Sequence, residues 1–171
     1  MSKSRTKILL LAVLTLLGFF GVKSYQIIKQ KESFGKQLPN FSESLTVDST
    51  HFSIQKIPQN TPVIVLYLDP DCGICTKQVE ELIKSKSQLE NAQVFLVSVE
   101  SVTQHRAFAQ KYGLSQIPNF YLLSLPKAEL YKTFGSAASP HLFVYNTQHQ
   151  LVKDFKFPFS VVDALPLIRQ H

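Results

Sequence analysis

Cysteine is scarce in this chain of 171 residues, which has only Cys72 and Cys75. A structural zinc site needs four ligands, and the sequence has neither a second CxxC motif nor a paired histidine motif. A zinc module is therefore disfavoured, and we expect no bound metal. Internal repeats and low-complexity tracts are also missing from the body of the chain. Together with 44% hydrophobic residues, these features predict one ordinary globular domain.

The body of the chain also lacks an excess of positive charge, although the formal net charge of the whole sequence is +6. Six of the eighteen Lys and Arg residues lie within residues 1–34, which hold a single acidic residue. The remaining twelve basic residues face eleven acidic ones. A nearly neutral domain has no electrostatic footprint for a phosphate backbone, so nucleic-acid binding is not expected.

The N-terminus has the outline of an export signal. Lys3, Arg5 and Lys7 precede an uncharged run, ILLLAVLTLLGFFGV, at residues 8–22. The run ends without the small-residue A-x-A pattern of a cleavage site, which favours an uncleaved signal anchor over a cleaved signal peptide. A buried core helix is the remaining alternative.

This interpretation sets the expected organisation of the whole chain. We expect a cytoplasmic tail at residues 1–7, a membrane-spanning signal anchor at 8–28, a polar tether at 29–38 and a globular domain at 39–171. Short basic N-terminal tails usually stay on the cytoplasmic side. The sequence therefore predicts a protein of the bacterial cell envelope, anchored in the inner membrane with its domain facing the periplasm.

Apolar runs in the body alternate between strand and helix patterns. VIVLYL at residues 63–68 is a short continuous apolar run, typical of a buried parallel strand. From Cys75 onward, apolar residues recur at helical spacing. The later expected elements are a strand at 94–99, a helix ending at Gly113, a strand at 120–123, a helix at 128–134, strands at 142–145 and 150–155, and a helix at about 160–169. This order predicts an α/β sandwich with a mixed sheet.

The two cysteines form the motif CGIC between the first strand and the first helix of the body. Unpaired N–H groups and the helix dipole in the first turn stabilise a thiolate, so Cys72 is expected to be the nucleophile. Cys75 lies two intervening residues further on and can resolve a mixed disulfide. A static structural disulfide is the alternative, but so small a loop would remove little unfolded-state entropy.

The sequence resembles the thioredoxin superfamily, specifically its extracytoplasmic redoxin branch (TlpA-like and AhpC/TSA-redoxin proteins). The resemblance covers about residues 39–171. Beyond CGIC, it is carried by LPNF at residues 38–41, the strand VIVLYL, and SAASP at 136–140 before the strand LFVY. It implies a thioredoxin-like three-layer sandwich preceded by the N-terminal transmembrane helix.

The same resemblance implies the roles of the residues around the pair. Pro140 would have a cis peptide bond and lie against the cysteines, which leaves the Ser139 backbone free to pair with a substrate peptide. Gly73 and Ile74 would complete the substrate-binding surface. His141 follows Pro140 directly and is the candidate for proton transfer.

The function implied is thiol:disulfide oxidoreductase activity without a bound cofactor. Its partners would be extracytoplasmic protein disulfides or dithiols and a membrane or extracytoplasmic thiol redox partner. A non-catalytic thioredoxin-fold docking or metal-delivery module remains the alternative.

Two departures from the family pattern leave the redox chemistry open. Leu66 occupies the position at which thioredoxins carry a buried carboxylate. Asp69 and Asp71 precede Cys72 and would oppose its ionisation, whereas Lys77 would favour it, so the direction of the Cys72 pKa shift is not determined by the sequence.

Overall fold

The computed structural model describes residues 13–26, 36–135 and 138–168. The chain divides into two compact units, residues 1–34 and 35–171. In the first unit, residues 13–26 form a helix. Among the described residues, no helix has both the length and the apolar character needed to cross a membrane. The predicted cytoplasmic tail and both ends of the predicted anchor lie outside the described residues.

The second unit is built on a five-stranded sheet in the order β3-β2-β1-β4-β5. The central strand β1 (Val63–Tyr67) runs parallel to β2 (Gln93–Ser98), and β2 runs parallel to β3 (Phe120–Ser124). On the other side, β4 (His141–Tyr145) pairs antiparallel with β1 and forms a hairpin with β5 (Leu151–Lys156). The predicted mixed sheet with a closing hairpin is confirmed.

Helices connect the strands in the predicted alternation. They are α2 (Gly73–Lys84), α3 (Val102–Tyr112), α4 (Lys127–Phe134) and α5 (Leu165–Ile168). The closing helix is shorter than expected, because a 3-10 turn at Val161–Asp163 comes before α5. Pro166 has no N–H to donate to the carbonyl of Val162, and proline is tolerated in the first turn of an α-helix, which is its place in α5, but disfavoured in the interior of a longer helix.

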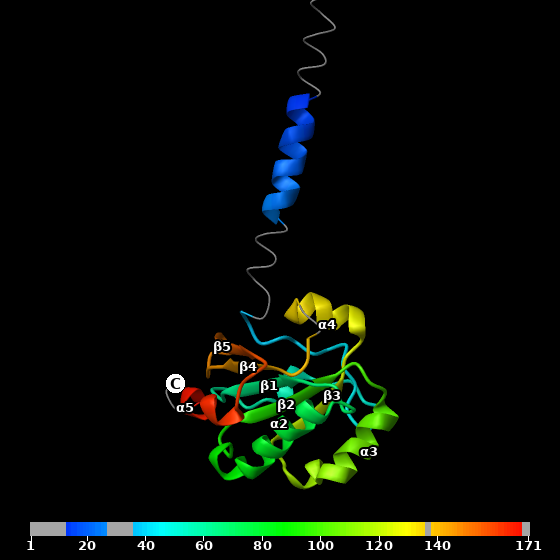
Figure 1. The fold of residues 1–171 in the computed structure, drawn as a ribbon, viewed down its shortest axis with the longest axis vertical. Helices are drawn as coiled ribbons and strands as arrows, with labels where there is room; N and C mark the ends of the chain where they lie inside the picture. Colours follow the sequence, from blue (N-terminus) through cyan, green and yellow to red (C-terminus); the bar gives the residue numbers. More distant parts are fainter. Residues whose placement is uncertain (1–12, 27–35, 136–137, 169–171) are drawn as a thin grey trace, which may run out of the picture. The chain divides into compact units, whose positions relative to one another are not determined.

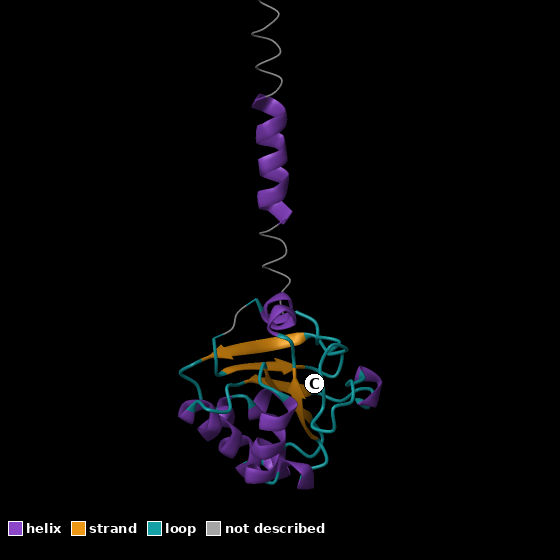
Figure 2. Cartoon of the chain, turned by 90° about the vertical axis from the view of Figure 1, so that its right-hand side faces the viewer, coloured by secondary structure: helices purple, strands orange, loops and turns teal. Residues whose placement is uncertain are grey.

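Strand β1 is buried on both of its faces, and the two faces contact different layers (Figures 1 and 2). Ile64 and Leu66 pack in a core cluster with residues of α2, α3 and α5. Val65 and Tyr67 pack in a second cluster with residues of α4 and of the segment before β1. The α/β sandwich predicted from the alternation, and the thioredoxin-like layering implied by the resemblance, are therefore confirmed.

The segment before β1 forms an isolated β-bridge at each edge of the sheet. Gln37 forms a β-bridge with Gln150 beside β5, and Leu45 forms one with Ser124 at the end of β3. The Leu38 N–H also donates to the carbonyl of His149 at 2.8 Å. The globular unit therefore includes residues 36–38, whereas the polar composition predicts a start near residue 39.

One histidine is enclosed in the core without a polar partner. His105, on α3, has no solvent exposure, and neither ring nitrogen has a hydrogen-bond partner among the described residues. Burial lowers the pKa of His105 to about 4, because the charged form would lose its hydration. The folded domain therefore holds this imidazole neutral.

Acid should destabilise the domain through His105. An unfolded chain binds a proton at this side chain below about pH 6.5, whereas the folded chain does so only near pH 4. Stability is then present above pH 6.5 and is lost as the pH falls toward 4, by about 3 kcal/mol at most. Urea unfolding of His105→Leu should show a weaker loss of stability between pH 7 and 4 than the wild type. Equal losses in both proteins would contradict this assignment.

Candidate functional site

The cysteine pair lies where the chain leaves β1 and enters α2. The connection is a tight turn in which the side chain of Asp69 accepts the N–H of Asp71 at 2.9 Å. The backbone carbonyl of Asp69 accepts the N–H of Cys72 at 3.1 Å. Asx turns of this kind are typical of the Asp-Pro-Asp sequence found here. Asp69 thus fixes the point at which α2 begins.

Cys72 is the N-cap residue of α2. Its sulfur accepts the backbone N–H of Cys75 at 3.3 Å, and its carbonyl accepts the N–H of Thr76 at 3.0 Å. The side chain of Cys72 is partly exposed, whereas Cys75 is fully buried in the core cluster below it. The structure therefore brings the two predicted cysteines together and gives only one of them access to solvent.

This arrangement gives the two thiols opposite pKa shifts. The pKa of Cys72 is lowered, chiefly because the Cys75 side chain donates a hydrogen bond to its sulfur, and the backbone N–H groups of Cys75 and Ile74 add to the effect. Partial burial and the charge of Asp69 act in the opposite direction but are outweighed. The direction of the Cys72 pKa shift, which the sequence left open, is therefore downward.

Cys75 is held as a thiol. Burial, followed by its hydrogen bond to Cys72, raises the pKa of Cys75 to about 11. Hydrogen bonds from the Asp69 backbone and the Ser139 side chain partly offset this rise. The side chain of Ser139 therefore contacts Cys75 directly, an interaction that the sequence did not indicate.

The predicted substrate-binding residues surround this pair to different extents. The Ser139–Pro140 peptide bond is cis, as the resemblance implied. Ile74 exposes 43% of its surface on the first turn of α2. A Cβ atom placed on Gly73 would meet no atom within 4 Å, so the backbone beside Cys72 is open to an incoming chain. Their role in substrate binding stays a prediction.

His141 has its own polar partner. Its Nε2 lies 3.0 Å from an oxygen of Asp154, and its ring stacks on Phe143 with centroids 4.0 Å apart. Burial lowers the pKa of His141, and the hydrogen bond to Asp154 partly offsets this effect. Phe143, two residues along β4, belongs to the α4-side cluster, whereas Cys75 belongs to the opposite one. Proton transfer by His141 to the cysteines stays a prediction.

Leu66 is fully buried in the same cluster as Cys75. The place of the thioredoxin carboxylate is therefore occupied by an apolar side chain that cannot accept a proton. Within the described residues, no group of three or more His, Cys, Asp or Glu side chains is arranged to hold a metal ion.

A family model described as the AhpC/TSA family matches residues 34–154. The chain belongs to the AhpC/TSA family. No curated protein matches the sequence significantly. Assignment to this redoxin family agrees with the resemblance drawn from the sequence and with a cysteine at the start of the first helix after the central strand.

Solved structures similar to this AhpC/TSA protein share its thioredoxin fold. A thiol:disulfide interchange protein of the thioredoxin family from Chlorobium tepidum TLS has a TM-score of 0.62 at 17% identity, covering 78% of this chain and 94% of that one. A secreted Mycobacterium tuberculosis disulfide oxidoreductase, homologous to E. coli DsbE, gives 0.57 at 16% identity, covering 68% and 84%. Copper-bound ScoI of Arabidopsis thaliana gives 0.61 at 12% identity, covering 81% and 100%.

The opposite pKa shifts of Cys72 and Cys75 in this redoxin should give the two thiols different alkylation rates. At pH 7, iodoacetamide should modify Cys72 about tenfold or more faster than Cys75, because only Cys72 has a lowered pKa. Mass spectrometry of the reduced protein over time measures both rates.

Substitutions at Cys75 test the origin of the shift. In Cys75→Ala, the rate–pH midpoint of Cys72 should rise, since the side-chain donor is lost. In Cys75→Ser it should rise less, because the hydroxyl can still donate. An unchanged midpoint in Cys75→Ala would refute this cause.

Proposed function

We propose that this redoxin is a thiol:disulfide oxidoreductase that exchanges disulfides with extracytoplasmic proteins through Cys72 and Cys75. The observation that carries the proposal is the asymmetry of the pair: a partly exposed sulfur with a lowered pKa lies directly above a buried thiol with a raised pKa. Attack on a disulfide needs a thiolate that a substrate can reach, and Cys72 meets both conditions.

In the reductive direction, the Cys72 thiolate attacks one sulfur of the client disulfide. A bond forms between Cys72 and that sulfur, the client S–S bond breaks, and the second client sulfur leaves as a thiolate. Cys75 then gives up its proton and attacks Cys72, which expels the first client sulfur. The client gains two electrons from the redoxin, one proton from Cys75 and one proton from solvent, which had received the proton of Cys72 on ionisation, and the redoxin is left with a Cys72–Cys75 disulfide.

The raised pKa of Cys75 affects the second step, in which Cys75 attacks the mixed disulfide. Part of the rise comes from the hydrogen bond between the two cysteine side chains. That contribution disappears once Cys72 is bonded to a client sulfur, so deprotonation of Cys75 becomes easier when resolution is required. With Leu66 in place of a carboxylate, the departing client thiolate is the nearest new base for this proton.

We place the client chain along the cis-proline loop. Ser139 touches the resolving thiol through its side chain, and its backbone can pair with an extended peptide. Gly73 offers open space on the other side of Cys72, and the exposed Ile74 offers an apolar contact. These three positions, with Pro140, would hold a client disulfide over the Cys72 sulfur.

The N-terminal segment supports a location at the membrane. Residues 8–22 are uncharged behind three basic residues. The described helix at 13–26 exposes apolar side chains around its circumference, including Leu14 at 61%, Leu17 at 64% and Phe20 at 60%. We propose that this segment anchors the chain in the bacterial inner membrane, with the redoxin unit on the periplasmic side.

Redox titration of the full chain tests the activity. Thiols counted after equilibration in dithiol buffers should follow a reversible two-electron curve. A midpoint near about −270 mV would mark a reductant and one near about −120 mV an oxidant. Cys72→Ser should lose client reduction entirely, whereas Cys75→Ser should accumulate the mixed disulfide, which a non-reducing gel reveals.

Other outcomes would point to other functions. A pair that stays in one state at every potential would favour a non-catalytic docking domain. Thiols protected only by added copper would favour a metal-delivery module; the structure of ScoI, which shares the fold, has copper bound.

Membrane topology has its own test. Protease added to spheroplasts should digest residues 36–171, while a cytoplasmic control protein stays intact. Deletion of residues 8–22 should move the protein into the soluble fraction and protect it from the protease. Digestion only after lysis would place the domain on the cytoplasmic side.

A further inference from the structure

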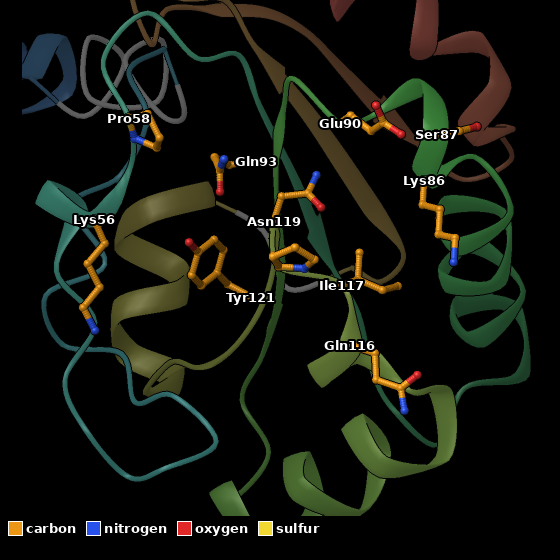
Figure 3. A pocket seen from close by; sticks show the side chains of 11 residues that line it. Lys56, Pro58, Lys86, Ser87, Glu90, Gln93, Gln116, Ile117, Asn119 and Tyr121 are labelled. Atoms are coloured by element: carbon orange, nitrogen blue, oxygen red, sulfur yellow. The ribbon is translucent and has the colours of Figure 1, made fainter.

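A cavity of about 570 Å³ lies at the end of the sheet opposite the cysteine pair. Gln93 begins β2, and Asn119 precedes β3, whereas Cys72 follows the far end of β1, to which β2 is parallel. Figure 3 shows these side chains together with Tyr121, Lys56 and others around the opening. The volume is in the range of pockets that hold small organic ligands.

Gln93 gives this cavity an unused hydrogen-bond acceptor. Its residue surface is only 9% exposed, and its Oε1 has no hydrogen-bond partner among the described residues. In Figure 3 the amide lies between Pro58 and Asn119, with its oxygen toward Tyr121. A buried amide oxygen without a donor is costly unless a ligand or water supplies one. A ligand with an N–H group would satisfy it.

Two other side chains that line the cavity, those of Asn119 and Tyr121, are held in place by contacts within the domain. Asn119 donates both hydrogen bonds of its amide at 2.7 Å, to the carbonyls of Leu89 and Ala92, and so is held in place. The ring of Tyr121 stacks on Phe95 with centroids 5.1 Å apart. Pro58, Ile117 and Pro118 add apolar surface. The cavity is therefore preformed, with an apolar wall suited to a flat ring.

The charged side chains of the lining favour an anion. Lys56 and Lys86 stand on opposite sides of the opening in Figure 3, and Glu90 is the one acidic residue that lines it. The lining therefore carries a net positive charge. A carboxylate on the ligand would be attracted to the lysines and repelled by Glu90.

From this geometry we propose that the cavity binds a small aromatic carboxylate that carries an amide N–H. The N–H donates to Gln93 Oε1, the ring lies against the wall formed by Tyr121 and the prolines, and the carboxylate faces the lysines. The site is separate from the cysteine pair, so binding does not depend on the thiol chemistry.

N-acetyl-L-tyrosine has all three features and serves as the probe. It would be titrated into the full ¹⁵N-labelled chain in detergent micelles while the side-chain amide signals of Gln93 and Asn119 are followed by NMR. Saturable shifts should give a dissociation constant of about 0.1–1 mM, as expected for a ligand of this size. N-acetyl-L-tyrosinamide lacks the carboxylate and 3-(4-hydroxyphenyl)propionate lacks the N–H, so both should bind more weakly.

Matched variants distinguish specific binding in this cavity from non-specific attraction of the anionic probe to positive charge. Gln93→Leu should weaken binding by about tenfold, the usual effect of losing a hydrogen bond to a buried group. Lys56→Gln and Lys86→Gln each remove one exposed charge at the opening and should weaken binding by about two- to threefold. Glu90→Gln should tighten it. Lys84→Gln removes an exposed charge outside the cavity and should change nothing. Backbone amide signals for Gln93→Leu, followed in every titration, would report whether the variant is folded.

Several results would overturn the proposal. These are an absence of saturable shifts at Gln93 and Asn119, equal binding of all three compounds, and equal binding by the wild type, Gln93→Leu and both lysine variants. Equal weakening by Lys84→Gln would likewise reduce the effect to general charge attraction.

Discussion

Strand β1 is the element on which the rest of the domain depends, because it is buried along its whole length and on both faces. It pairs with β2 on one side and β4 on the other, and its alternating side chains supply both core clusters. The end of β1 is also where the chain turns toward α2. Packing around this strand therefore positions the cysteines, and a one-residue shift of its register would move each side chain to the wrong layer.

The chemistry follows from how deeply each sulfur is buried. Cys72 and Cys75 are one helical turn apart, yet the N-cap position leaves the first at the surface and the helix directs the second into the core. The buried thiol then acts as a donor to the exposed one. This hydrogen bond lowers the pKa of Cys72, and burial together with the same hydrogen bond raises the pKa of Cys75.

Periodicity predicted most of the fold because its strands are continuous apolar runs and its helices end at clear signals, such as Gly113 with a φ of 62°. It failed at the closing helix, where the structure has a 3-10 turn at Val161–Asp163 followed by the short α5, with Pro166 in the first turn of α5. At the site, spacing and the family resemblance identified the cysteines. The pKa direction could not be predicted, since it depends on competition between a side-chain hydrogen bond and the nearby Asp69 charge. The Gln93 cavity gave no sequence signal, because its lining comes from segments that are distant along the chain.

The segment before β1 has a consequence for the order in which the domain can form. Gln37 bridges to Gln150, and the carbonyl of Lys36 accepts the N–H of Leu151 at 2.8 Å. These contacts join residues more than a hundred positions apart, so the loop that they close is long. Closing a long loop costs conformational entropy, so we expect these contacts to form late in folding. During synthesis the sheet edge at β5 cannot be completed until nearly the whole chain has been made.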